Sequence, residues 1–116
     1  YAGFINPQFT LEKKGDKMPV GFHSRMQSFT NHEIDIRKGD TIYLFSDGYI
    51  DQFGGPEGRK FMKAKLRTLL LDNQTLDMAS QKSVFNNTLE EWINYPTGGD
   101  TPVGQIDDII LLGVRV

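Results

Sequence analysis

The pattern of apolar and polar positions is strand-like through the first part of the chain. Residues 1–16 carry two short apolar stretches around a proline turn, which predicts a β-hairpin. Residues 31–37 alternate between apolar and polar side chains, which is typical of a half-exposed strand. After a turn at residues 38–40, residues 41–46 include a continuous apolar run. We expect this run to form a central strand that is buried on both faces.

The pattern becomes helical after a loop that is expected at residues 52–58. One predicted helix ends at residues 72–73, and its apolar face consists of Met62, Leu66, Leu69 and Leu70. A second helix is expected to be capped by Thr75 and to end at Pro96. Its apolar face consists of Phe85, Leu89 and Trp92. Residues 109–116 are strongly β-forming, so the order predicts an α+β fold with antiparallel sheet strands and two helices before the last strand.

Composition limits the class of protein further. The 116 residues fit one domain, but the sequence begins without Met on a strand-like segment, so we expect a piece of a longer protein. A formal net charge of -2 argues against nucleic acid as the main partner. The absence of Cys excludes disulfides and thiolate chemistry, and it fits a reducing compartment. We therefore expect a cytoplasmic location.

Two acidic motifs stand at the ends of predicted strands. Asp47 lies between Ser46 and Gly48 at the end of the central strand, and Asp107 and Asp108 directly precede the last strand. Carboxylates fixed at strand ends are good ligands for hard cations, although ordinary turns and solvated loop ends have the same composition. If the two strands are neighbours, the motifs would meet in an oxygen-only site. Such a site suits Mg²⁺, Mn²⁺ or Ca²⁺ better than Zn²⁺.

Other charged residues lie close to these motifs in the sequence. Asp51 could add a ligand, whereas Asp40 is better explained as a turn residue. A basic run follows, in which Lys60, Lys63 and Arg67 are expected to share a helix face opposite the apolar one. A solvated helix face is the ordinary explanation of this run. The alternative is electrostatic steering of an acidic or phosphorylated partner.

A family resemblance rests on the order of these segments. Residues 39–51, Gly-Asp-Thr-Ile-Tyr-Leu-Phe-Ser-Asp-Gly-Tyr-Ile-Asp, resemble the segment of SpoIIE-like phosphatases in which an apolar run leads into Ser/Thr-Asp-Gly and a further acid. These enzymes are bacterial members of the metal-dependent protein phosphatase 2C (PP2C) family. The acidic pair and apolar run at residues 107–112 resemble the close of the same domain, and residues 1–7 resemble the opening of its second half. The resemblance implies that residues 1–116 are the C-terminal half of a four-layer α-β-β-α phosphatase sandwich.

The resemblance also implies a metal site. It assigns Asp47 and Asp107 as ligands in a centre that holds two Mn²⁺ or Mg²⁺ ions in the intact domain, and it assigns no catalytic nucleophile. Gly48, Asp51 and Asp108 are supporting candidates. The family's earlier metal-ligand aspartates have no counterpart in this sequence. We therefore expect both metal spheres to be incomplete here, and it stays open whether this chain binds metal by itself.

The implied function is metal-dependent hydrolysis of phosphoserine or phosphothreonine in bacterial signal transduction. The intact parent domain would act on a regulatory protein of the anti-sigma-antagonist type and would follow an upstream sensor domain. The resemblance therefore also allows the cytoplasmic part of a membrane-attached sensor. This fragment alone is expected to be inactive, and its exposed sheet could pair with a second copy. Two alternatives stay open: a non-catalytic pseudo-phosphatase that binds a partner, and an unrelated β-rich module with a structural Ca²⁺.

Overall fold

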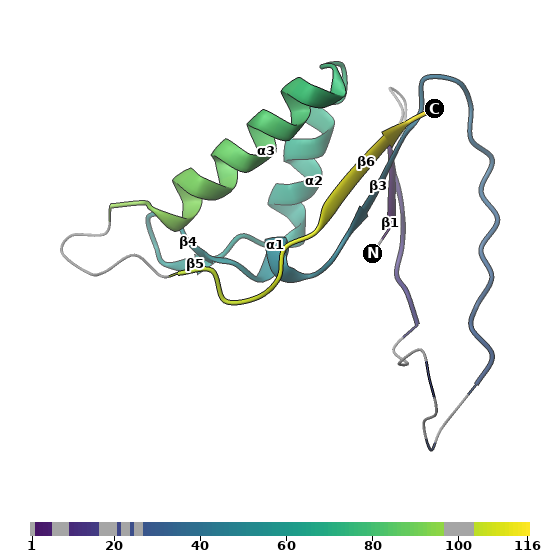
Figure 1. Cartoon of the computed structure of the whole chain (residues 1–116), viewed down its shortest axis with the longest axis horizontal. Coiled ribbons are helices and arrows are strands. Elements are labelled where there is room, and N and C mark those ends of the chain that lie inside the picture. The colour runs from purple at the N-terminus through teal and green to yellow at the C-terminus, as the bar shows by residue number, and fades with distance from the viewer. Residues whose placement is uncertain (1, 6–9, 17–20, 22–23, 25–26, 97–103) are drawn as a thin grey trace.

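The computed structural model describes residues 2–5, 10–16, 21, 24, 27–96 and 104–116. The larger sheet has the order β2-β1-β3-β6 and comprises β1 (Ala2–Ile5), β2 (Thr10–Lys13), β3 (Thr41–Phe45) and β6 (Leu111–Arg115) (Figure 1). A small sheet comprises β4 (Phe53–Gly54) and β5 (Arg59–Lys60). The helices are α1 (Gly48–Asp51), α2 (Lys63–Asp72) and α3 (Met78–Ile93). The predicted α+β class, with two long helices before the last strand, is confirmed.

Every pairing in the larger sheet is antiparallel. The predicted hairpin is present as β1 and β2, and β1 also pairs with β3. β6 pairs with the other edge of β3, so β3 is central as expected. The turn before β3 is also confirmed: Gly39 has a φ of +97°, which favours glycine, and the Asp40 carboxylate accepts a hydrogen bond of 2.8 Å from the backbone N–H of Arg37. Asp40 therefore belongs to this turn, at the opposite end of β3 from Asp47.

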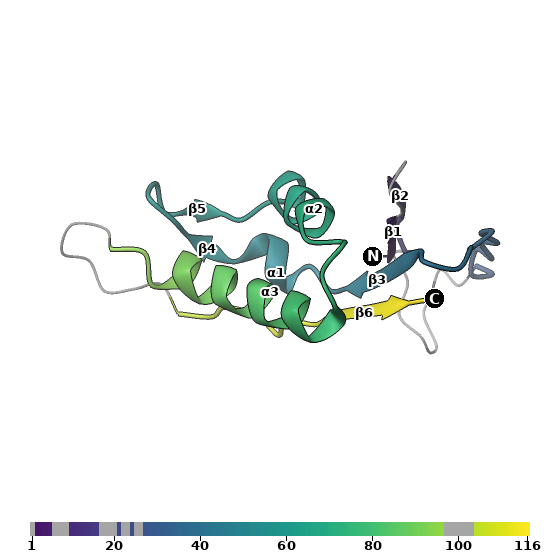
Figure 2. The same cartoon turned by 90° about the horizontal axis from the view of Figure 1, so that it is seen from above.

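The helices lie on one side of this sheet (Figures 1 and 2). Tyr43 and Phe45 point to the covered face and are buried in the core. On the opposite face, Leu44, Leu112 and Val114 are each about half exposed, at 46%, 52% and 48%. The prediction that β3 is buried on both faces is therefore wrong. The apolar residues on both faces of β3 show that both faces can be covered. The described part of the chain covers only one of them, with its helices.

The buried core lies between the sheet, α1 and the two long helices. Its members are Tyr43, Phe45, Tyr49, Ile50, Phe61, Leu66, Leu70 and Phe85. Leu89 and Trp92 of α3 pack against this cluster, as their spacing predicted. The helices described here include none with the length and apolar character needed to cross a membrane.

Two details of the helix starts differ from the prediction. Met62 is not on the buried face of α2: it lies just before the helix, with a φ of +74° and a side chain that is 56% exposed. The cap of α3 is Asp77 and not Thr75, because the Asp77 carboxylate accepts the backbone N–H of Ser80 at 2.9 Å. Thr75 lies in the preceding turn, where its hydroxyl is too far upstream for that role.

The alternating segment at residues 31–37 is not a strand. It is extended, but it pairs with none of the described strands, and both views place it on the far side of β1 and β3 from the helices (Figures 1 and 2). Alternating apolar and polar side chains indicate that the two sides of a segment face different environments. They do not show that the backbone of the segment has a hydrogen-bonding partner strand. Residues 18–21 and 97–104, which Pro and Gly mark as loop-like, lie largely outside the described residues.

The predicted loop at residues 52–58 contains a small hairpin. β4 and β5 pair across a four-residue turn, and the hairpin packs against the end of α3. The backbone N–H of Gly55 donates to the Trp92 carbonyl oxygen at 2.8 Å. A Cβ at Gly54 would lie 2.0 Å from that same oxygen, so the close contact explains why glycine occurs here.

Candidate metal-binding site

The pairing of β3 with β6 brings the two acidic motifs together. Phe45 is opposite Leu111, and one step beyond this pair the backbone N–H of Ser46 donates to the Ile110 carbonyl oxygen at 3.1 Å. Because the strands are antiparallel, the residues that follow β3 lie beside the residues that precede β6. The condition set by the sequence, that the two strands must be neighbours, is met. We call Asp47, Asp51, Asp107 and Asp108 the acidic edge.

The Ser46 side chain fastens the two motifs to each other. Its hydroxyl donates to the Asp108 carbonyl oxygen at 3.1 Å and accepts from the backbone N–H of Ile110 at 3.2 Å. A hydroxyl can do both because it carries one donor and two acceptor lone pairs. Ser46 therefore extends the strand pairing through its side chain, at the place where the backbone turns away into α1.

Gly48 is required by the same contact. A Cβ at this position would lie 2.2 Å from the Asp108 carbonyl oxygen and 2.9 Å from its carbonyl carbon. No side chain fits at these distances, so only glycine lets the start of α1 approach the chain before β6. The Gly48 in the first motif is thus explained by the Asp108 backbone in the second.

Asp47 begins α1 without capping it. It occupies the N-cap position, but its side chain makes no capping hydrogen bond, and its carbonyl oxygen accepts the backbone N–H of Asp51 at 2.9 Å. The residue is exposed. An Asp at a helix start that leaves its carboxylate out of the cap keeps both oxygens for another ligand.

Asp107 and Asp108 have different environments, as expected for adjacent residues at a strand end. Asp107 lines a pocket of about 220 Å³ together with Gly48 and Asp51, whereas Asp108 does not. One carboxylate oxygen of Asp107 accepts the backbone N–H of Asp108 at 2.8 Å. Asp108 contributes its backbone carbonyl to the contacts with Ser46 and Gly48. Its contribution to the acidic edge is therefore structural.

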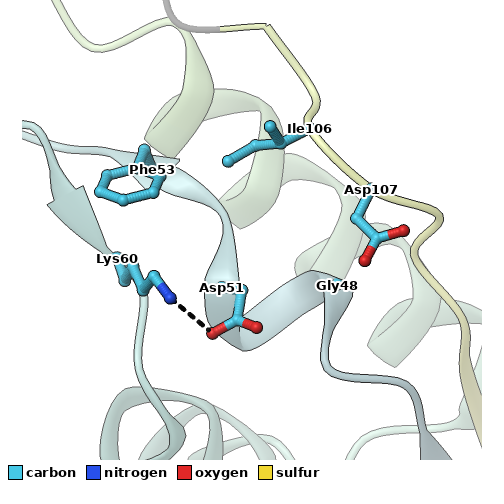
Figure 3. Close-up of a pocket in the computed structure, with 6 residues that line it drawn as sticks. All are labelled: Gly48, Asp51, Phe53, Lys60, Ile106 and Asp107. Atoms are coloured by element: carbon cyan, nitrogen blue, oxygen red, sulfur yellow. Dashed lines mark hydrogen bonds and ion pairs between the residues drawn. The ribbon is translucent and has the colours of Figure 1, made fainter.

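The same pocket contains a positive charge. Lys60 on β5 forms an ion pair of 3.3 Å with Asp51, and Phe53 and Ile106 complete the lining (Figure 3). Figure 3 shows the carboxylates of Asp51 and Asp107 near α1, with that of Asp51 directed toward Lys60. Both partners of the ion pair are nearly half exposed, so water screens it and it can open readily.

The donor type at the acidic edge fits a hard cation, but the number of donors is small. Carboxylate oxygens are the ligands that Mg²⁺ and Mn²⁺ prefer. Within the described ranges, however, no three His, Cys, Asp or Glu side chains converge closely enough to form a metal site on their own. Asp51 and Asp107 line one pocket, and Asp47 is not part of its lining. A cation held there would have to take its remaining ligands from water or from other residues.

The three basic residues that were expected on one helix face have separate positions and partners. Lys60 lies on β5, so the prediction that it shares a helix face with Lys63 and Arg67 is wrong. On α2, Lys63 and Arg67 form ion pairs with Glu12 of β2 at 2.7 and 3.3 Å. Partial burial raises the pKa of the Glu12 carboxyl, but Lys63, and after it Arg67, outweigh this effect and hold the pKa below its ordinary value. These two cations thus attach α2 to the sheet.

Gln52 is a site residue that the sequence analysis missed. Its side chain is 1% exposed, and its amide nitrogen donates to the carbonyl oxygens of Gly104 and Phe53 at 3.1 and 3.0 Å. Gln52 therefore ties the segment that leads to Asp107 to the segment that follows α1. No sequence pattern marks such a residue, because its partner is a backbone group about fifty residues away.

The comparisons with known proteins agree with this arrangement. The sequence matches the family model for stage II sporulation protein E (SpoIIE) over residues 4–116. The chain belongs to the SpoIIE family. No curated protein matches it. The predicted resemblance to SpoIIE-like members of the PP2C family is confirmed.

The chain is also similar to a solved structure, the SiaA-PP2C domain of Pseudomonas aeruginosa. The two share 28% sequence identity, and their folds match with a TM-score of 0.79. The match covers 99% of this chain and 42% of that one. The chain therefore has the fold of part of a PP2C domain and spans less than half the length of this relative.

Proposed function

We propose that this chain forms part of a protein phosphatase domain that hydrolyses phosphoserine or phosphothreonine with the help of two Mn²⁺ or Mg²⁺ ions. The observation that carries the proposal is the pairing of β3 with β6, which brings the segment of Asp47 beside the segment of Asp107 at one end of the sheet. Ser46 and Gly48 fix this arrangement through their contacts with the Asp108 backbone. Family membership supports the reaction type. Because the chain spans 42% of the SiaA-PP2C domain, the activity belongs to the intact domain, and residues 1–116 alone are expected to be inactive.

The chain's own residues have distinct roles in this proposal. Asp47 and Asp107 would hold the metal ions from the side of the sheet, and neither would attack phosphorus. When bound, the ions would neutralise charge on the phosphoryl group and lower the pKa of the attacking water. Lys60 lines the same pocket as Asp107. Once its ion pair with Asp51 opens, the Lys60 ammonium group would provide a positive charge for the phosphate. Gly48 would let the α1 backbone approach the site closely.

The biological setting is part of the proposal. The substrate would be a phosphorylated regulatory protein of the anti-sigma-antagonist type, and a sensor domain upstream in the same protein would control the domain. We place this reaction in the cytoplasm. The exposed sheet face at Leu44, Leu112 and Val114 would be covered by the rest of the intact domain. The alternative is a homodimer, in which a second copy of the chain covers this face.

A second candidate function is a pseudo-phosphatase that binds its partner without catalysis. The observation in its favour is that the described residues include no group of three metal-ligating side chains. In that case the acidic edge would hold no catalytic metal. The partner would then bind equally well with and without Mn²⁺.

Hydrolysis of a phosphoserine peptide by the intact domain, with and without Mn²⁺, separates these possibilities. Asp47→Asn and Asp107→Asn should each lower the Mn²⁺-dependent rate by at least ~100-fold, since even residues that only orient metal ligands typically contribute 10–100-fold. Asp35→Asn makes the same charge change on the exposed segment before β3 and should leave the rate unchanged. Full activity in both acidic-edge variants would refute the proposed site. Absence of any hydrolysis, with partner binding that ignores Mn²⁺, would establish the pseudo-phosphatase.

A further inference from the structure

Positive charge is concentrated in one short part of the chain. Five of the thirteen Lys and Arg residues lie within residues 59–67, and Glu57 is the one acid within residues 56–71. The structure divides these five cations into two groups. Lys63 and Arg67 pair with Glu12 and hold α2 against the sheet. The other three surround a separate pocket.

This second pocket lies between the β4–β5 hairpin and the start of α2, and we call it the hairpin pocket. It has a volume of about 420 Å³. Its lining comprises three cations, one acid and three other residues: Arg59, Lys60, Lys65, Glu57, Pro56, Met62 and Trp92. Arg59 pairs with Glu57 at 3.0 Å, but both side chains are more than 60% exposed, so this pair is weak. Lys65 lies over the Trp92 ring, 5.3 Å from its centroid, and forms no ion pair within the described residues. Positive charge at the hairpin pocket is therefore available to an anionic ligand.

The apolar part of the hairpin pocket is held in a fixed position. Met62 exposes 56% of its surface, and its backbone, at a φ of +74°, is in a region that side chains other than glycine seldom occupy. Its backbone N–H is bound to the Ile50 carbonyl oxygen at 2.8 Å. Trp92 is fixed by a hydrogen bond of 3.0 Å from its ring N–H to the Gln52 carbonyl oxygen. An exposed Met and a fixed Trp among cations are features of protein-binding surfaces.

The hairpin pocket and the pocket at the acidic edge share Lys60. Lys60 lines both pockets, and its ammonium group is paired with Asp51 in the first one (Figure 3). A phosphorylated residue held at the acidic edge would therefore have its neighbours in the sequence over the β4–β5 hairpin. The cations there would favour carboxylates at those neighbouring positions.

We propose that the hairpin pocket binds an acidic segment of the substrate protein next to its phosphorylated residue. This inference rests on the proposed phosphatase function. It identifies the hairpin as the element that selects the sequence around the phosphate, with Lys65 and Arg59 as the selecting charges and Met62 and Trp92 as the apolar contacts.

The test compares three substrates of the intact domain. They are p-nitrophenyl phosphate, a phosphoserine peptide with acidic neighbours, and the same peptide with those acids replaced by their amides. Lys65→Glu should lower kcat/KM for the acidic peptide by about fivefold, the size of one exposed ion pair lost, while p-nitrophenyl phosphate hydrolysis stays within about twofold. Lys65→Arg should retain the preference for the acidic peptide. Lys38→Glu makes the same charge reversal in the turn before β3 and should change none of the three rates.

Several results would overturn the proposal. One is an equal rate on the acidic and amide peptides in the wild type, and another is an equal loss of rate on both peptides in Lys65→Glu. A third is a dimer that dissociates when Lys65 is changed, because the hairpin pocket would then be an interface between two copies of the chain. If the wild type hydrolyses no substrate, the phosphatase proposal fails by itself. The hairpin pocket is then tested by fluorescence anisotropy with the unphosphorylated acidic peptide. Binding that is lost in Lys65→Glu would still support an acidic partner, and absence of binding would refute it.

Discussion

Replacing Gly48 with Ala tests how tightly the acidic edge is built. Helix propensity alone would favour Ala by ~1 kcal/mol. Against this gain, the new Cβ would lie 2.2 Å from the Asp108 carbonyl oxygen, which is far inside van der Waals contact. Overpacking costs ~1–3 kcal/mol, and the upper end applies because the obstacle is a backbone carbonyl held by the Ser46 hydroxyl. We therefore expect a net loss of about 2 kcal/mol in the free energy of unfolding.

Urea denaturation of the intact domain measures this loss. With a slope of ~1–3 kcal/mol per molar urea, Gly48→Ala should lower the midpoint by about 1 M. Gly104→Ala is the matched control, because a Cβ at Gly104 meets no atom within 4 Å, and it should leave the midpoint within about 0.3 M. A wild-type midpoint for Gly48→Ala would show that Asp108 moves freely. The claim that these contacts fix the acidic edge would then be wrong.

Two further substitutions follow from the hydrogen bonds and ion pairs. Ser46→Ala removes both hydrogen bonds of the hydroxyl and should destabilise the protein by ~1–2 kcal/mol. The control, Ser83→Ala on the exposed side of α3, should have little effect. Equal urea midpoints for the two variants would contradict the role assigned to Ser46. Because Lys63 and its neighbouring cation keep the pKa of Glu12 low, the stability that this carboxylate contributes should be present above about pH 4.5 and lost as pH falls below that value. Glu12→Gln should therefore weaken the dependence of the urea midpoint on pH between neutrality and about pH 3.5, and an unchanged pH profile would show that the ion pairs contribute nothing.

Much of the candidate site could be predicted because its signals are local. Asp47 and Gly48 follow an apolar run of strand length, and Asp107 precedes a second such run. Once two apolar strands of this kind are placed in one antiparallel sheet, their acidic ends can meet. The apolar face of α3 was equally clear, since Phe85 and Trp92 fall on one side of a helix.

The features that could not be predicted depend on contacts between distant residues. Residues 31–37 have the alternation of a strand, but whether a strand forms is decided by a partner, which alternation does not encode. Met62 fits the apolar period of α2, yet its backbone is held by Ile50 and turns it out of the helix. Lys60 was grouped by spacing with the cations of α2. It belongs to β5, and a strand of two residues is too short to give a periodic signal in the sequence.

The link between Ser46 and Asp108 also affects the order of events in folding. These residues are 62 positions apart, so the acidic edge forms only when β6 closes a loop that includes α1, the hairpin and both long helices. Contacts of such long range carry a loop-closure cost and tend to form late. A molecule in which the N-terminal hairpin and the helices are already formed would still lack the site. Metal ions added during refolding should therefore leave the early steps unchanged and stabilise the chain only after β6 has joined the sheet.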